Sequence, residues 1–169
     1  GVRMMQALGH VAIRKFHLNE GHASLAVLEL LRDRGATSQF DDVRERVVFT
    51  THTPVPAGHD QFDHALVAQV LGDPVPRDLL RMLSGTDRLN TTRLALSLAG
   101  HVNGVARKHR EVSHGMFPEY AIASVTNGVH SVTWTSAPFR ALFDRYVPGW
   151  REDPALLRQS RHRVPLAGV

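Results

Sequence analysis

Short apolar runs alternate with amphipathic stretches along most of this chain. Residues 11–18, 47–51 and 121–126 are rich in β-branched and aromatic side chains, which is typical of strands. The amphipathic stretches predict helices at residues 1–8, 23–34, 62–71, 78–83, 90–99, 107–116, 139–146 and 154–160. Strands that alternate with helices favour a parallel sheet covered by helices. The pattern therefore predicts the α/β fold class.

Two of the predicted helices carry an apolar stripe. These stripes are Leu25, Leu28 and Leu31 in the helix at 23–34, and Phe62, Leu66 and Val70 in the helix at 62–71. Gly35 and Gly72 are the expected helix ends, and Asn90 and Thr91 are both candidate N-caps. Residues 102–106 fit either a turn or a short buried strand.

The composition narrows the class of protein. The chain has 169 residues, enough for a domain with a core, and it begins at Gly1, so we expect it to be part of a longer protein. It has no cysteine, which excludes disulfides and thiolate metal sites and is compatible with the cytoplasm, the location we expect. No apolar run is long enough for a membrane span. The net charge is +4 and the arginines are scattered, so neither nucleic acid nor a membrane is an expected partner.

Two polar segments, at residues 17–22 and 50–60, each lie where a predicted strand ends. Open α/β folds bind ligands beyond the carboxyl ends of their strands. The first segment offers Asn19, Glu20 and His22, and the second offers His52 in a loop whose path two prolines fix. Asn and neutral His can both donate and accept hydrogen bonds, which suits sugar hydroxyls. The structural alternative is that Glu20 caps a helix while the histidines pack or bond to backbone.

Asn127 lies before Gly128 at the end of the run at 121–126, and it is a further candidate for contact with a ligand. The alternative is an ordinary Asn-Gly turn. Asn103 precedes Gly104 in a similar pattern, for which we favour a structural role.

The sequence gives little support for a metal site, a phosphate-binding loop or a pair of catalytic carboxylates. Histidines and carboxylates gather at residues 17–22 and 59–64, but without a zinc-binding spacing, so no metal is predicted. There is no glycine-rich phosphate loop, and no pair of carboxylates suited to glycoside hydrolysis stands out. The residues alone thus indicate a carbohydrate-binding crevice without an evident nucleophile or general acid.

Four segments together resemble the α-glucan (glycogen and maltodextrin) phosphorylases, especially their shorter bacterial and archaeal branch. The segments are residues 16–31, 48–62, 102–113 and 125–134, and the resemblance extends over roughly residues 1–157. It implies a glycosyltransferase of the two-domain GT-B type with Rossmann-like parallel sheets. Residues 1–127 would be the later part of the N-terminal lobe, and residues 128–169 the crossover and the start of the C-terminal lobe.

The resemblance also implies the reaction and its cofactor. Phosphorylases use inorganic phosphate to release glucose 1-phosphate from α-1,4-glucan, with pyridoxal phosphate bound through a lysine of the C-terminal lobe. The only lysines of this chain, Lys15 and Lys108, lie outside that motif, so we expect it to bind no cofactor covalently and to be inactive alone. The expected partners are the glucan, phosphate and the remaining lobe, and a homo-oligomer of the parent stays open.

Site residues follow from the resemblance position by position. His52 matches a histidine that bonds the 6-hydroxyl of the glucosyl unit, with its carbonyl facing the anomeric centre, and Asn127 matches an asparagine sharing that hydroxyl. Glu20 and His22 match residues that line the channel, and Trp134 matches a tryptophan near the cofactor. Two alternatives stay open, namely a non-catalytic glucan-binding module and a nucleotide-sugar glucosyltransferase of the same architecture.

Overall fold

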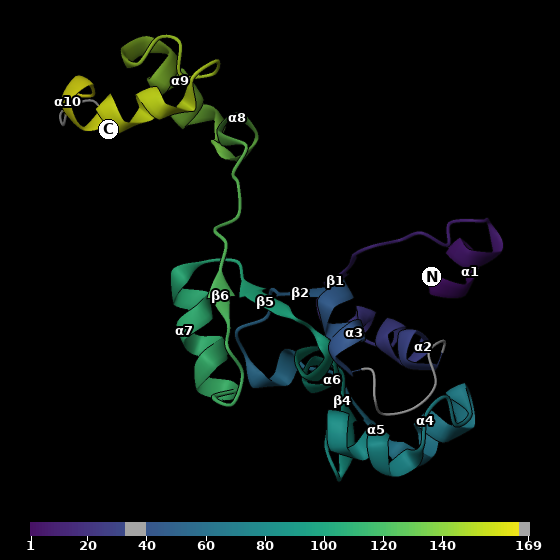
Figure 1. Cartoon of the computed structure of the whole chain (residues 1–169). Coiled ribbons are helices and arrows are strands. Elements are labelled where there is room, and N and C mark those ends of the chain that lie inside the picture. The colour runs from purple at the N-terminus through teal and green to yellow at the C-terminus, as the bar shows by residue number, and fades with distance from the viewer. Residues whose placement is uncertain (33–39, 166–169) are drawn as a thin grey trace. The chain divides into compact units, whose positions relative to one another are not determined.

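The computed structural model describes residues 1–32 and 40–165, which separate into two compact units, Gly1–Thr126 and Asn127–Val169. The elements of the first unit are α1 (Val2–Ala7), β1 (Phe16–Asn19), the 3₁₀ turn η1 (Gly21–Ala23), α2 (Ala26–Arg32), α3 (Phe40–Arg46), β2 (Val47–Thr51), the 3₁₀ turn η2 (Pro56–Gly58), β3 (Gln61–Asp63), α4 (His64–Leu71), α5 (Arg77–Ser84), β4 (Arg88–Asn90), α6 (Thr91–Leu98), β5 (His101–Gly104), α7 (Arg107–Met116) and β6 (Ala123–Ser124) (Figure 1).

A parallel four-stranded sheet in the order β1-β2-β5-β6 forms the centre of the first unit. This confirms the predicted α/β class and resolves residues 102–106, because His101–Gly104 is a strand. Leu18, Phe49 and Val102 are paired across the sheet and all three are buried. Side chains alternate between the two faces of a strand, so the next paired row, Asn19, Thr50 and Asn103, lies on the opposite face. One face thus meets the core and the other carries polar groups.

The helix after β1 begins later than the sequence predicts. Residues Gly21–Ala23 wind as a 3₁₀ turn, and α2 starts at Ala26. Leu28 and Leu31 are buried in the core as expected, together with Val27 and Leu30 on the same helix. The expected end at Gly35 lies outside the described residues.

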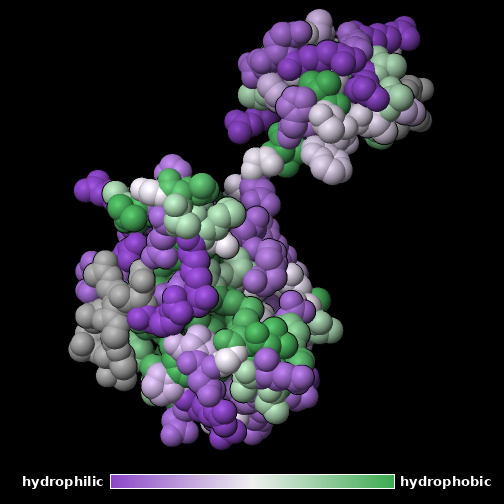
Figure 2. Space-filling view, turned by 90° about the vertical axis from the view of Figure 1, so that its right-hand side faces the viewer, coloured by the Kyte–Doolittle hydropathy of each residue, from purple (hydrophilic) through white to green (hydrophobic). Residues whose placement is uncertain are grey.

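The helix predicted at residues 62–71 begins later than expected, although it ends at Gly72 as predicted, and the residues of its apolar stripe are exposed. Phe62 belongs to β3, which pairs antiparallel with β4, and α4 starts only at His64. Val67 is the buried residue of α4, whereas Leu66 and Val70 are exposed. The β3–β4 ribbon orients the helix so that a different stripe meets the core. Figure 2 views the side of the first unit on which α4 lies, and hydrophobic surface is visible there.

The second unit contains α8 (Ser131–Trp134), α9 (Ala137–Tyr146), the 3₁₀ helix η3 (Pro154–Gln159) and α10 (Ser160–Arg163). Trp150 is its buried centre, with its ring 5.5 Å from that of Phe143. The Trp150 indole N–H and the Arg151 guanidinium both donate to Asp144. The hydrogen bond from Arg151 is the main reason why the pKa of Asp144 is lowered to about 2. That this unit begins a C-terminal lobe stays a prediction.

Candidate functional site

A line of hydrogen bonds crosses three strands on the polar face of the sheet. Thr50 Oγ1 donates to Asn103 Oδ1 at 3.1 Å, and His17 Nε2 lies 2.7 Å from the same Thr50 oxygen. Because the single hydroxyl proton of Thr50 goes to Asn103, His17 must donate through Nε2. Asn103 is buried and bonded, in keeping with the structural role expected for it. This line joins β1, β2 and β5 next to the ends at which the polar segments leave the sheet.

Glu20 follows β1 with an unusual backbone. Its φ is +71° and its ψ 167°, and it is the one non-glycine residue with positive φ among the residues described. Its N–H donates to the Thr50 carbonyl at 2.9 Å, which extends the pairing of β1 with β2 by one residue. Positive φ is costly for a residue with a Cβ and persists only where the surroundings hold it. The turn after β1 is therefore held by specific contacts of Glu20.

The Glu20 carboxylate accepts four hydrogen bonds. Oε2 accepts from the His52 N–H at 2.6 Å and the Thr53 hydroxyl at 2.9 Å, while Oε1 accepts from the Gly21 N–H at 3.1 Å and the Thr51 hydroxyl at 3.4 Å. We call Glu20, Thr51, His52 and Thr53 the Glu20 cluster. Burial alone would raise the pKa of Glu20, but the hydrogen bonds from His52, Thr53 and Gly21 outweigh it, so the pKa is lowered. The carboxylate is therefore ionised near neutral pH.

The loop that starts at His52 is also held at its far end. His59 is buried, and its Nδ1 lies 2.8 Å from Thr92 Oγ1 at the start of α6. The Thr91 N–H donates to the Asp60 carbonyl at 3.1 Å. Burial is the main cause that lowers the pKa of His59, which keeps its ring neutral near pH 7. Two anchors thus fix the loop, and one of them is Glu20.

The start of α6 also packs closely against the Glu20 turn. A Cβ built on Gly21 would lie 2.7 Å from Thr91 Oγ1 and 2.9 Å from Thr92 Oγ1. No side chain fits there, so this position needs glycine. Of the two candidate N-caps, Asn90 caps the same helix by accepting from the Arg93 N–H, and Thr91 is its first residue. One helix end therefore supports both polar segments.

The predicted site residues differ in how the structure places them. His52 is exposed, and within the described residues no hydrogen bond of its imidazole is found. Asn19 and His22 are exposed in the same unit, beside Glu20. Asn127 and Trp134 belong to the second unit, where both are exposed. The convergence of Asn127 with His52, and a place for Trp134 at the cofactor, stay predictions.

Sequence reasoning missed the residues that support this site. Thr53 and Thr92 hold the two ends of the loop, and Thr50 links the strands beneath it. The clustering of threonines around His52 was the available signal. Thr53 and Thr92 each lie 33 positions from their partners, Glu20 and His59, so the pattern does not reveal which atoms they meet.

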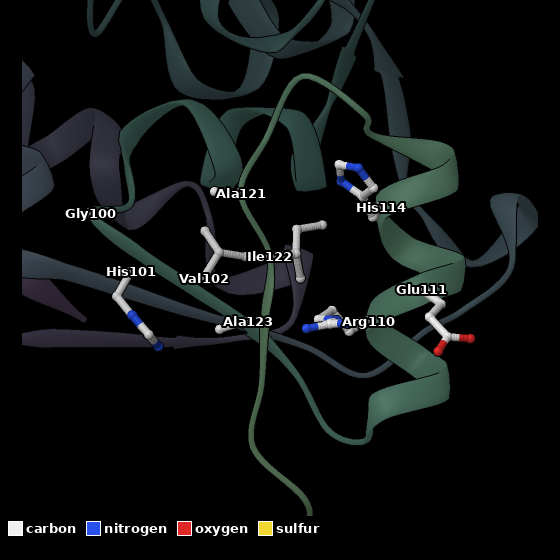
Figure 3. Close-up of a pocket in the computed structure, with 9 residues that line it drawn as sticks. All are labelled: Gly100, His101, Val102, Arg110, Glu111, His114, Ala121, Ile122 and Ala123. Atoms are coloured by element: carbon white, nitrogen blue, oxygen red, sulfur yellow. The ribbon is translucent and has the colours of Figure 1, made fainter.

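A pocket of about 590 Å³ lies elsewhere, between α7, β5 and the segment at 121–123 (Figure 3). We call it the α7 pocket. Arg110 and His114 extend from α7 towards that segment, His101 lies at the amino end of β5, and Glu111 sits on the outer side of the helix. The pocket is lined by the amino-terminal half of β5, away from the carboxyl end at which the His52 loop leaves the sheet.

The fold and the Glu20 cluster define an α/β protein with a rigid polar loop beyond the ends of parallel strands. No family model matches the chain. It is 33% identical to the maltodextrin phosphorylase of Thermococcus litoralis over 90% of its length, and 36% identical to the glycogen phosphorylase of Mycobacterium tuberculosis over 80%. The glycogen phosphorylase of Aquifex aeolicus is 34% identical over 78%.

The chain therefore belongs to the glycogen and maltodextrin phosphorylase family. It spans about a fifth of the length of these curated relatives, namely 20% of the first two and 22% of the third. Among residues 1–32 and 40–165, no helix is long and apolar enough to cross a membrane.

Proposed function

We propose that this chain supplies part of the substrate site of an α-glucan phosphorylase. The parent protein transfers the terminal glucosyl unit of an α-1,4-glucan to inorganic phosphate and releases glucose 1-phosphate. The family membership supports this reaction class. The observation that carries the proposal is the His52 loop, which presents an exposed imidazole and is held by Glu20 at one end and by the His59–Thr92 contact at the other.

His52 has two roles in this proposal. Its imidazole exchanges hydrogen bonds with a hydroxyl of the terminal glucosyl unit, because neutral histidine offers one donor and one acceptor. Its backbone carbonyl stabilises the positive charge that develops at the anomeric carbon in the transition state. A fixed dipole of this kind costs no reorganisation during the reaction, which explains the need for a rigid loop. Asn19 and His22, exposed next to Glu20, line the approach of the glucan.

Pyridoxal phosphate belongs to the proposed parent protein, where its phosphate group supplies proton transfer. The lysines of this chain do not fit its covalent attachment. Lys15 donates to the Glu45 carbonyl, and Lys108 pairs with Glu111 at 3.0 Å on the exposed face of α7. Neither lysine contacts the Glu20 cluster. The cofactor lysine therefore lies in the part of the parent outside this chain.

The whole protein encoded by the parent gene tests the proposal. With maltoheptaose, phosphate and pyridoxal phosphate it should release glucose 1-phosphate. Glucosyl transfer from a nucleotide sugar without phosphorolysis would instead favour the glucosyltransferase alternative. Saturable maltooligosaccharide binding with neither activity would favour a glucan-binding module.

A further inference from the structure

Glu20 is the most constrained residue of the site. Its φ of +71° is unfavourable for a side chain with a Cβ, where glycine would fit without strain. The following position is already glycine, so a two-glycine turn would satisfy the backbone more easily. The presence of a carboxylate at this strained position therefore indicates that the side chain is needed for its contacts.

Those contacts use the full acceptor capacity of the carboxylate. A carboxylate offers about four lone pairs, and Glu20 accepts four hydrogen bonds from Gly21, Thr51, His52 and Thr53. A sugar hydroxyl could donate to Glu20 only by displacing one of these donors. This arrangement favours a supporting role over direct contact with the glucan.

The shortest of these bonds, 2.6 Å, runs from the backbone N–H of His52 to Oε2. Fixing this N–H fixes the peptide plane between Thr51 and His52 and so the starting direction of the His52 side chain. The Thr53 hydroxyl binds the same oxygen and holds the residue on the other side of His52. Hydrogen bonds to an ionised acceptor are stronger than neutral ones, and the lowered pKa of Glu20 is in keeping with a charged acceptor.

We infer that Glu20 is a positioning residue that clamps the backbone of His52 and Thr53 and thereby aims the imidazole and carbonyl of His52 at the substrate. The effect on catalysis rests on the proposed function, whereas the hydrogen bonds that form the clamp are independent of it. Loss of the clamp should therefore lower the rate of the chemical step more than it weakens glucan binding.

Glu20→Gln in the whole protein is the test variant, with Glu111→Gln as its matched control on the exposed face of α7. The amide nitrogen of glutamine is a donor and would face either His52 and Thr53 or Gly21 and Thr51. We expect kcat for phosphorolysis of maltoheptaose to fall about 100-fold, as for a displaced catalytic group, with KM changed less than about threefold. A raised KM with unchanged kcat would indicate direct glucan contact and overturn the inference.

A double-mutant cycle with Thr53→Val also distinguishes positioning of the His52 loop from direct contact with the glucan. Thr53→Val removes one donor to the same oxygen without changing the shape of the side chain. If Glu20 acts through the loop, the losses of Glu20→Gln and Thr53→Val should not add, because both loosen one contact network. Fully additive losses would contradict a shared clamp.

Hydrogen–deuterium exchange provides a readout that does not need activity. Residues 52–58 contain only five backbone amides because Pro54 and Pro56 have none, so a peptide over this loop reports strongly on His52 and Thr53. Glu20→Gln should speed exchange in this peptide about tenfold or more, and Glu111→Gln should not. Unchanged exchange would refute the clamp, even if phosphorolysis is observed. Faster exchange without glucose 1-phosphate release would keep the clamp and refute the proposed function.

Discussion

The Glu20 cluster and the α7 pocket both bring histidines and charged groups together, yet they are built in opposite ways. In the cluster, a strained residue, four hydrogen bonds and a second anchor at Thr92 fix one loop. In the pocket, the charged side chains lie on an exposed helix face, and the Lys108–Glu111 pair is open to solvent. The comparison teaches that pocket volume is a weaker guide to function than a strained backbone held in place by several hydrogen bonds.

Replacing a glycine by alanine should give the largest difference in stability between the two regions. In Gly21→Ala the new Cβ would collide with Thr91 and Thr92, so we expect a loss of about 3 kcal/mol in the free energy of unfolding. Gly115→Ala in α7 meets open space and should stabilise the chain by about 0.5–1 kcal/mol. Urea denaturation of both variants measures the difference. Similar values for the two would mean that the Glu20 turn is not tightly packed.

Two buried histidines allow a finer comparison. His59 Nδ1 lies 2.8 Å from Thr92 Oγ1, whereas His109 Nδ1, on α7, lies 3.3 Å from Ser113 Oγ. Thr92→Val keeps the shape but leaves the His59 ring without this partner, and should cost about 1–2 kcal/mol. Ser113→Ala should cost less, because the bond is longer and alanine favours the helix. An equal or larger loss in Ser113→Ala, measured by the same denaturation, would argue against the loop anchor.

A smaller effect should appear as a dependence on pH. The pKa of Glu20 is lowered in the folded state, so its contribution to stability is complete above the ordinary carboxyl pKa of about 4.3 and is lost as the pH falls through the folded-state pKa. The stability difference between wild type and Glu20→Gln should therefore shrink as the pH falls from 5 towards 3. A difference that stays constant over this range would show that the charge of Glu20 contributes nothing.

Local patterns predicted most helices and the β2 strand, because their signals lie within a few residues. The strands predicted at 11–18 and 121–126 are only the short strands β1 and β6, and α3 was not predicted. The strand at 47–51 and the helix at 107–116 have the bounds that the sequence predicts, since each carries a continuous pattern of its own. Three-residue strands such as β3 and β4 carry too little pattern of their own. They form because they pair with each other, which is why Phe62 was assigned to a helix.

The sequence predicts that the segments of Glu20 and His52 lie close together, but not which atoms of these segments bond to one another. Glu20 and His52 follow strands, so the parallel sheet brings their segments to the same edge. Glu20 is a helix cap, as the structural alternative states, but it caps the 3₁₀ turn η1, where its carboxylate accepts from the Gly21 N–H, and not the longer helix α2. Its longer-range bonds to His52 and Thr53 depend on the positive φ, which nothing in the residue types around Glu20 indicates.

The most direct measurement compares two exposed histidines at opposite ends of the sheet. His52 lies beyond the carboxyl end of β2, and His101 lies at the amino end of β5 in the α7 pocket. In the whole protein, His52→Ala should lower kcat/KM for maltoheptaose phosphorolysis about 100-fold or more, while His101→Ala should leave it within about twofold. Equal effects of the two substitutions, or a larger effect of His101→Ala, would contradict the assignment of the substrate site to the His52 loop.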